Sequence, residues 1–353
     1  MSDARWERGA ADVEVLGRAG LDVPEFRRQS LRLLRSLVSV DAAFFATVDP
    51  ATLLFTGALS EEPLAAATPQ FLDNEFGRAD VNKFASLAGA TDSVGTLDHA
   101  TAGDRMASAR YREVIRPLGL GDELRVALMS SGRCWGVLCL HRQDARLGFD
   151  RGEIALLRRL APHLGEGLRK GIALFSTAPA DAIAEGPGII VLDSDLSVIS
   201  VNPQAQRWLS QLGDADWPAH LDLPLPIYAC AAHVLGYEHD AATPAVTRLR
   251  RVEGGWLTVH ASPLMGTAGS QVAVILDAAD QSQLSSLMLA ARGLTAAQSR
   301  VAVLVLRGRS TQQIVNELQI SSNTVQEHLR AVFEKFGIGS RRELVAALSG
   351  RRP

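Results

Sequence analysis

Apolar residues between Leu294 and Leu348 recur at the spacing of amphipathic helices. The runs are Val301, Leu304 and Val305; Ile314, Val315 and Leu318; and Leu344, Val345 and Leu348. A Ser or Thr precedes each run and is followed three residues later by Gln or Glu, at Thr295, Ser310 and Ser340. This capping box satisfies backbone donors at a helix start. The pattern predicts three short helices in this segment.

A fourth amphipathic helix follows the second after a very short connection. Only Gln319 to Asn323 separates Leu318 from Thr324. This length suits a tight turn in which Ile320 fills the core and Ser321 or Ser322 caps the next helix. At about 100° per residue, one stripe of that helix faces the core, and it comprises Val325, Leu329, Val332 and Phe336. The pattern predicts an all-α, four-helix helix-turn-helix domain over residues 290–352.

The opposite face of this fourth helix is polar. A recognition helix inserts its amino-terminal part into the major groove. We therefore expect base contacts from Gln326, Glu327 and Arg330, since Gln suits adenine, Arg suits guanine and Glu accepts from cytosine N4. The candidate DNA-binding residues are Ser322, Asn323, Thr324, Gln326, Glu327, Arg330 and Lys335. The alternative is an ordinary solvated face.

Several short motifs occur along this segment at fixed spacing. They are Leu294-Thr295, Gly308-x-Ser310, Leu318-x-Ile320-Ser321, Thr324-Val325-x-x-His328-Leu329, Lys335-x-Gly337-Ile338 and Ser340-Arg341-x-Glu343-Leu344. Together they resemble the LuxR-type DNA-binding domain. Ala297-Gln298 stands where the family usually has Arg-Glu, and we expect this change to weaken an internal ion pair that the family often uses. Gln326 replaces a usual basic residue, so the base preference cannot be copied from relatives.

The first half of the chain mixes helix and strand patterns. Helices are predicted at 26–37 and 150–173, and strands at 42–48, 53–59, 124–128 and 134–140, with a turn at Ser130-Ser131-Gly132. This order, with Trp135-Gly136-Val137-Leu138 as the central hairpin strand, resembles a GAF sensory domain over residues 21–175. The string from Arg110 to Arg125 also looks like actinobacterial regulators that pair such a domain with a LuxR-type tail.

A second α+β unit is predicted over residues 182–280. Two short strands flank the turn Asp193-Ser194-Asp195, and Asn202-Pro203 opens a helix. Three further strands are predicted at 245–251, 256–261 and 272–276. The arrangement resembles a PAS domain, although residues 213–243 fit no pattern. Linkers are expected at 176–185 and near 278–291.

Charge is divided unevenly along the chain. From Ala290 to Pro353, ten basic residues face four acidic ones, a net charge of +6, whereas the whole chain carries −3. A compact basic segment behind an acidic body of −9 favours a nucleic-acid module attached to something else. With 47% hydrophobic and 21% charged residues, the composition excludes a disordered or rod-like chain.

The sequence predicts neither membrane insertion nor secretion. The longest strictly apolar run, Val301–Leu306, is far shorter than the ~18 residues of a membrane span. The charged amino terminus does not read as a signal peptide. Three cysteines cannot pair completely and suit a reducing cytoplasm.

No catalytic or metal-binding pattern is recognised. Cys134 and Cys139 are five residues apart, so a regular strand would place them on opposite faces and prevent them from sharing an ion. No GxxxxGK[ST], GxGxxG or GxSxG motif and no HExxH spacing occurs. We expect no enzyme activity, no metal and no cofactor.

Two apolar seams could pack within their own domains or against partner helices. The first is Ile154, Leu157, Ala161, Leu164 and Leu168, with Pro162 inside it, and the second is Leu284, Leu287, Met288 and Ala291. The second lies directly before the basic module.

These patterns predict a multidomain α+β protein with an all-α carboxyl-terminal domain. The expected function is a cytoplasmic one-component transcriptional regulator that binds double-stranded operator DNA as a homodimer. A small-molecule signal would bind the GAF-like or the PAS-like domain. The alternative is a signalling scaffold whose sensory domains bind proteins and for which DNA contact is secondary.

Overall fold

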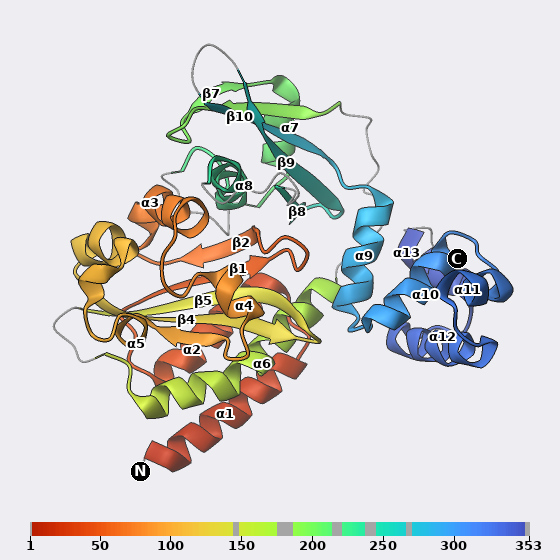
Figure 1. Ribbon diagram of the computed structural model, residues 1–353, viewed down its shortest axis with the longest axis horizontal. Helices are drawn as coiled ribbons and strands as arrows, with labels where there is room; N and C mark the ends of the chain where they lie inside the picture. Colours follow the sequence, from red (N-terminus) through yellow and green to blue (C-terminus); the bar gives the residue numbers. More distant parts are fainter. Residues whose placement is uncertain are drawn as a thin grey trace.

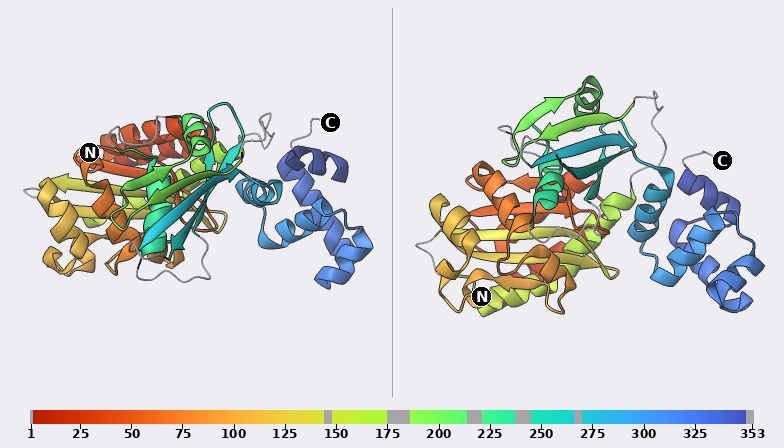
Figure 2. Two further views of the ribbon diagram at one scale, coloured as in Figure 1. Left: turned by 90° about the horizontal axis from the view of Figure 1, so that it is seen from above. Right: turned by 45° about the horizontal axis from the view of Figure 1, so that its top comes forward.

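The computed structural model describes residues 2–143, 148–174, 186–213, 221–236, 245–265 and 270–349. Two five-stranded antiparallel sheets and a helical carboxyl-terminal domain follow one another along the chain (Figure 1). Helix α9 stands between the sheets and the helical domain in Figure 1 and in both views of Figure 2. No helix within the described residues is long and apolar enough to cross a membrane.

The first sheet has the strand order β2-β1-β5-β4-β3. Its strands are β1 (Ala42–Val48), β2 (Phe55–Ser60), β3 (Val94–Thr96), β4 (Leu120–Ser130) and β5 (Arg133–Gln143). Ser131 and Gly132 join β4 to β5 with φ values of 51° and 71°. Two successive positive φ angles characterise the hairpin turn that matches strand twist. The expected hairpin is therefore confirmed, and both strands extend beyond the predicted bounds.

Both faces of this sheet are covered. Helices α1 (Ser2–Arg18), α2 (Val23–Leu37) and α6 (Arg151–Ala173) form one cover, while the other contains α3 (Thr68–Leu72), α4 (Phe84–Gly89), α5 (Leu97–Ala100) and short helical turns between residues 65 and 118. Every residue of β1 is buried. Because β1 is shielded on both faces, its pattern is continuously apolar instead of alternating.

The apolar seam of α6 packs within the molecule. Leu157, Leu164 and Leu168 are fully buried, and α6 packs against β4, β5 and α1. Pro162 lies inside a helix that continues through it. Helix α1, which precedes the predicted domain start at residue 21, lies along α6, and Gly17 permits the approach because a Cβ there would lie 2.5 Å from the carbonyl oxygen of His163.

The second sheet has the order β7-β6-β10-β9-β8. Its strands are β6 (Gly188–Leu192), β7 (Val198–Val201), β8 (Val246–Arg250), β9 (Trp256–Leu264) and β10 (Gln271–Ala278). Helix α7 (Pro203–Ser210), capped by Asn202 as expected, and α8 (Leu225–Leu235) cover one face. Helix α8 falls in the stretch that fitted no pattern. The expected linker at 176–185 lies outside the described residues.

The two sheets meet at their edge strands β2 and β8. The Oγ1 of Thr52 donates to the carbonyl of Val246 at 2.9 Å, and the Oγ1 of Thr247 donates to the carbonyl of Phe55 at 3.0 Å. The guanidinium of Arg248 donates to both Asp49 carboxylate oxygens at 2.7 and 2.8 Å. Helix α8 contacts both sheets and is buried nearly all round, so the two domains share part of their core.

Candidate nucleic-acid interface

The carboxyl-terminal domain consists of four short helices around a small core. They are α10 (Ala296–Leu306), α11 (Thr311–Leu318), α12 (Ser322–Phe336) and α13 (Arg341–Ser349). The predicted stripe of α12 faces inward, since Val325, Leu329 and Val332 are at most 2% exposed. Phe336 is partly buried, and Val345, expected to be apolar core, is 38% exposed.

Local hydrogen bonds fix the helix starts, and two of the three predicted capping boxes form completely. Both halves of the capping box are present at Thr295 and at Ser310. At the third start, the Glu343 carboxylate reaches the backbone N–H of Gly339 instead of that of Ser340. The turn between α11 and α12 runs through Gln319, whose φ of 53° is left-handed, and Ser321 caps α12.

The amino-terminal half of α12 presents an exposed polar surface. Ser322, Asn323, Gln326, Glu327 and Arg330 are all exposed, and Thr324 is half-buried. The amide of Asn323 donates to the Glu327 carboxylate at 3.0 Å along the helix. Among the described residues, no hydrogen bond or ion pair engages the Arg330 side chain. Six of the seven candidate residues therefore lie together at this end of the helix.

Lys335 lies at the other end of α12 and turns back toward α10. Its ammonium donates to the carbonyl of Gly293 at 2.6 Å and to Oε1 of Gln298 at 2.9 Å. Gln298 is uncharged, so it accepts a hydrogen bond from Lys335 without forming an ion pair. Lys335 fixes the seating of α12 against α10.

The domain is joined to the rest of the molecule through α9 (Gln281–Ala291), a helix within the connection expected near residues 278–291. Leu284, Leu287 and Met288 are buried, and the helix contacts α6, α10 and α13. The Arg169 side chain on α6 donates to the carbonyl of Ala291. The second apolar seam therefore packs between domains.

Family comparisons agree with this geometry. The model of the family described as bacterial regulatory proteins, luxR family, matches residues 292–348. The carboxyl-terminal domain is a LuxR-type DNA-binding domain. The GAF domain model matches residues 22–168, so the first sheet and its helices form a GAF domain. The chain therefore combines a LuxR-type DNA-binding domain with a GAF domain. Neither family match covers the second sheet.

Among curated proteins, the transcriptional activator protein ExaE of Pseudomonas putida is 29% identical over 203 residues, covering 53% of this chain and 87% of ExaE. Among solved structures, a Vibrio cholerae VqmA–ligand–DNA complex is 18% identical over 48% of this chain and 85% of VqmA, with a TM-score of 0.23. The Escherichia coli DhaR(N)–DhaL complex is 14% identical over 79% of this chain and 90% of that chain, with a TM-score of 0.24. TM-scores this low do not establish a shared arrangement.

The GAF domain encloses a small chamber between its sheet and the α3 side. The chamber has a volume of about 20 Å³, with apolar walls that include Phe44 and Phe71 and a polar end formed by Arg110, Glu123 and His141. Burial is the largest influence on His141 and lowers its pKa to about 4. Burial raises the pKa of Glu123, but the surrounding cations outweigh it and hold that pKa at about 2.

The expectation that Cys134 and Cys139 lie on opposite faces of the sheet is wrong. Cys134 and Cys139 belong to the same hydrophobic cluster instead of opposite sides of the sheet. The register between β4 and β5 shifts between Leu128 and Met129, so simple alternation fails along this hairpin. Cys139 lies beside Glu123 and His141, a grouping that no spacing rule along one strand could reveal because it joins two strands.

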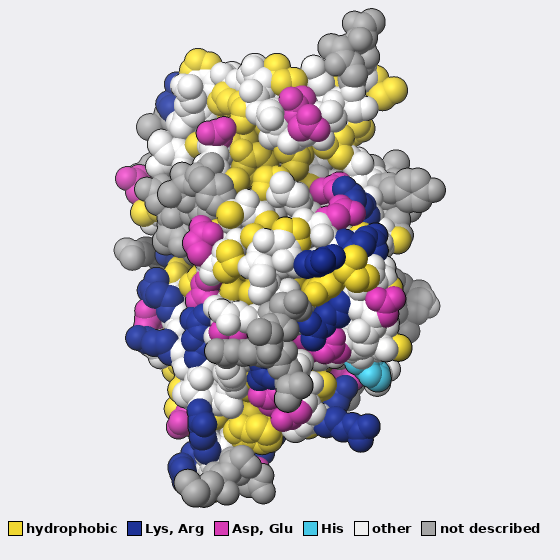
Figure 3. Space-filling view, turned by 90° about the vertical axis from the view of Figure 1, so that its left-hand side faces the viewer, with side chains coloured by type: hydrophobic (Ala, Val, Ile, Leu, Met, Phe, Trp, Pro, Cys, Tyr) yellow, Lys and Arg dark blue, Asp and Glu magenta, His cyan; other side chains and the backbone are white. Residues whose placement is uncertain are grey.

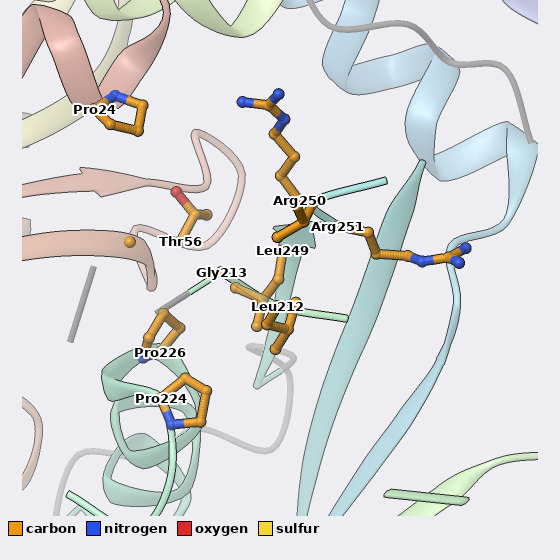
Figure 4. Close-up of a pocket in the computed structure, with 11 residues that line it drawn as sticks. Pro24, Thr56, Leu212, Gly213, Pro224, Pro226, Leu249, Arg250 and Arg251 are labelled. Carbon is orange, nitrogen blue, oxygen red and sulfur yellow. The ribbon is translucent and has the colours of Figure 1, made fainter. Parts of the chain in front are cut away.

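A larger pocket lies where the GAF domain meets the second sheet domain. It has a volume of about 250 Å³ and is lined by Pro24 and Thr56 from the first and by Leu212, Pro226 and Leu249 from the second. Figure 4 shows these side chains around one hollow, with Arg251 pointing away from the prolines. The lining is mainly apolar and is supplied by both domains.

Proposed function

We propose that the chain is a one-component transcription regulator that binds operator DNA through the amino-terminal half of α12. The observation that carries this proposal is the exposed polar face of α12, set by a buried apolar stripe. Gln326, Glu327 and Arg330 would read base edges, while Ser322, Asn323 and Thr324 lie at the helix start, where backbone N–H groups suit phosphate. Lys335 supports the position of the helix.

The proposed domain bounds are 21–175, 182–280 and 290–352. The second domain shares the strand order of the GAF sheet when both are numbered from their own first strand, which supports the PAS-like interpretation. We further propose a cytoplasmic, non-enzymatic homodimer. The palindromic operators of helix-turn-helix dimers mirror their two-fold symmetry.

We propose that a small molecule controls DNA binding from the GAF domain or from the pocket shared with the PAS-like domain. Helix α9 contacts α6 and two helices of the LuxR-type domain, so a change in either domain's position reaches the DNA-binding surface through packed side chains. A helix keeps its rotational phase along its length, unlike a flexible linker.

The first test is operator binding by full-length protein. Operator fragments would be selected from random DNA and titrated by fluorescence anisotropy. Arg330→Ala should weaken binding by about 1–3 kcal/mol through loss of a base or phosphate contact. Arg151→Ala, which removes the same charge from an exposed site on α6, is the matched control and should bind normally. Wild-type affinity for Arg330→Ala would contradict the helix orientation.

Two further measurements address the scaffold alternative and the control mechanism. Operator affinity should fall steeply with salt, with a log–log slope of about −0.9 per phosphate neutralised; a flat dependence favours the scaffold. Two residues inserted after Gln283 should reduce operator affinity by rotating the LuxR-type domain about α9. If the insertion leaves operator affinity and oligomeric state unchanged, the rotational phase of α9 does not control DNA binding. Native mass spectrometry of purified protein would identify a retained ligand.

A further inference from the structure

Three metal-ligating side chains converge on the face of the GAF sheet that lies toward α3. Glu123 on β4 lies directly across from His141 on β5, and Cys139 lies two residues before His141 on the same face. One ligand atom from each lies within 4.8 Å of the other two. All three side chains are buried, with Cys139 fully excluded from solvent. The set supplies one oxygen, one nitrogen and one sulfur.

Two of these groups have polar atoms that the protein leaves unsatisfied. Oε2 of Glu123 accepts from Nε and Nη2 of Arg110 at 2.9 and 2.7 Å, but Oε1 has no hydrogen-bond partner. Nδ1 of His141 also has none, and its Nε2 lies 3.8 Å from Oε1 of Glu123. Buried polar atoms are normally paired with protein, water or an ion, so this position calls for an occupant.

The space limits what that occupant can be. The chamber that these three residues help to line has a volume of about 20 Å³, and a water molecule needs at least about 10–15 Å³ on the same kind of measure. One water or one ion fits beside the three side chains. An organic molecule would require the walls to open.

Charged side chains surround the three candidate ligands, and the Nε of Arg125 lies 3.9 Å from Oε1 of Glu123. Arg110 and Arg125 are the cations of this network, and its anions are Glu123, Glu75 at 2.6 Å from Arg125, and Asp80, which accepts from the backbone N–H of Arg110 at 2.7 Å. Asp80 is partly exposed, so these charges do not select between cations, and the donor atoms of the three side chains decide which ion fits.

We propose that Glu123, Cys139 and His141 bind one divalent cation of the zinc type. Sulfur, nitrogen and carboxylate oxygen are the donor atoms that zinc takes in proteins, and three protein ligands leave a fourth position open to water or another small ligand. Binding forms one bond to each ligand atom, breaks the S–H bond of Cys139 and releases its proton to solvent. The site is independent of the proposed control by a small molecule.

Zinc binding by full-length protein tests the site, with the chain's other cysteines as matched controls. Chelator-treated protein would be titrated with Zn²⁺ against a competing chromophoric chelator. We expect one equivalent per chain. Cys139→Ser should bind at least about 100-fold more weakly, since losing a ligand exceeds the 10–100-fold effect of losing a supporting group. Cys134→Ser and Cys230→Ser remove equally buried thiols and should retain wild-type affinity.

Co²⁺ provides a second readout that reports the ligand itself. A thiolate-to-cobalt charge-transfer band should form in wild type, Cys134→Ser and Cys230→Ser and disappear in Cys139→Ser. If Cys139→Ser fails to fold by circular dichroism, His141→Gln keeps the thiolate and should still lose zinc affinity. Folded wild type that takes up no stoichiometric Zn²⁺ overturns the proposal, as does equal loss in Cys134→Ser. Either result would mean that the three side chains do not form a zinc site.

Discussion

The two sheets share one strand order but differ in how they are covered. Each runs second, first, fifth, fourth, third when its strands are numbered from its own start. The GAF sheet is packed on both faces, and β1 is buried throughout. In the second sheet, Ile189 on β6 and its cross-strand partner Ile275 on β10 are 43% and 39% exposed. The same topology therefore supports a two-sided and a one-sided core.

Their interiors differ in chemistry as well. The GAF interior contains buried ion pairs between Arg110 and Glu123 and between Arg125 and Glu75. Between the second sheet and helices α7 and α8, the interior consists mainly of aliphatic side chains, with Cys230 contributed by α8. Full enclosure on both faces lets the GAF sheet hold charges away from water, where pairing is obligatory. On the outside, acidic and basic side chains are interspersed over the face turned away from the LuxR-type domain (Figure 3).

The largest expected effect comes from breaking the enclosed network. Glu75→Ala leaves the fully buried Arg125 without its closest carboxylate, and we expect a loss of about 4 kcal/mol, within the 3–5 typical of such deletions. Hydrogen exchange read by mass spectrometry should show lost protection in β4 and β5. The control is Glu113→Ala, which breaks an exposed pair with Arg78 and should cost less than about 1 kcal/mol. Equal losses of stability in Glu75→Ala and Glu113→Ala would contradict the proposed difference between enclosed and exposed ion pairs.

A smaller effect is expected in α8, on which both domains depend. Ile227→Ala removes a fully buried side chain and should cost about 3 kcal/mol through lost burial and cavity formation. Because α8 contacts β2 as well as β9 and β10, exchange should increase in both sheets. Protection lost from the second sheet alone would show that the domains fold separately. Val252→Ala changes a position that is 63% exposed and should leave stability and hydrogen exchange unchanged.

The ion pair between Asp49 and Arg248, where the two sheets meet, should contribute less to stability than the Ile227 side chain. Asp49→Asn removes a charged acceptor from Arg248 and should cost about 2 kcal/mol, the scale of hydrogen bonds to charged groups. Urea unfolding followed by tryptophan fluorescence would measure it. A double-mutant cycle with Arg248→Met separates the pair's coupling from the other effects of each change. A coupling energy near zero would mean that the pair does not hold the sheets together.

The smallest effect is expected on the open face of the second sheet. Ile275→Thr should change stability by no more than about 0.5 kcal/mol, as is usual for surface positions. Its neighbour Val274 points into the core and is fully buried, so Val274→Thr is the matched comparison and should destabilise clearly. Thermal unfolding at two protein concentrations would show whether another copy of the chain covers this face. In that case, Ile275→Thr should destabilise the protein only at the higher concentration.

Elements governed by neighbouring residues could be predicted from the sequence. The capping boxes at Thr295 and Ser310 depend on residues three apart, and the buried stripe of α12 depends on helical period alone. The bounds of β1 and the turn between β4 and β5 were likewise predicted, because strand propensity and turn chemistry act within a few residues.

Features that need a partner distant in sequence required the tertiary structure. Helix α8 is apolar on nearly every side, so periodicity could not reveal it, and its burial arises only because two sheets enclose it. The grouping of Glu123 with Cys139 and His141 depends on strand register and on a shift between Leu128 and Met129. Sequence by itself determined the local elements and the polar face of α12. Tertiary packing decided which charges are enclosed, since whether a side chain reaches water is set by segments far along the chain.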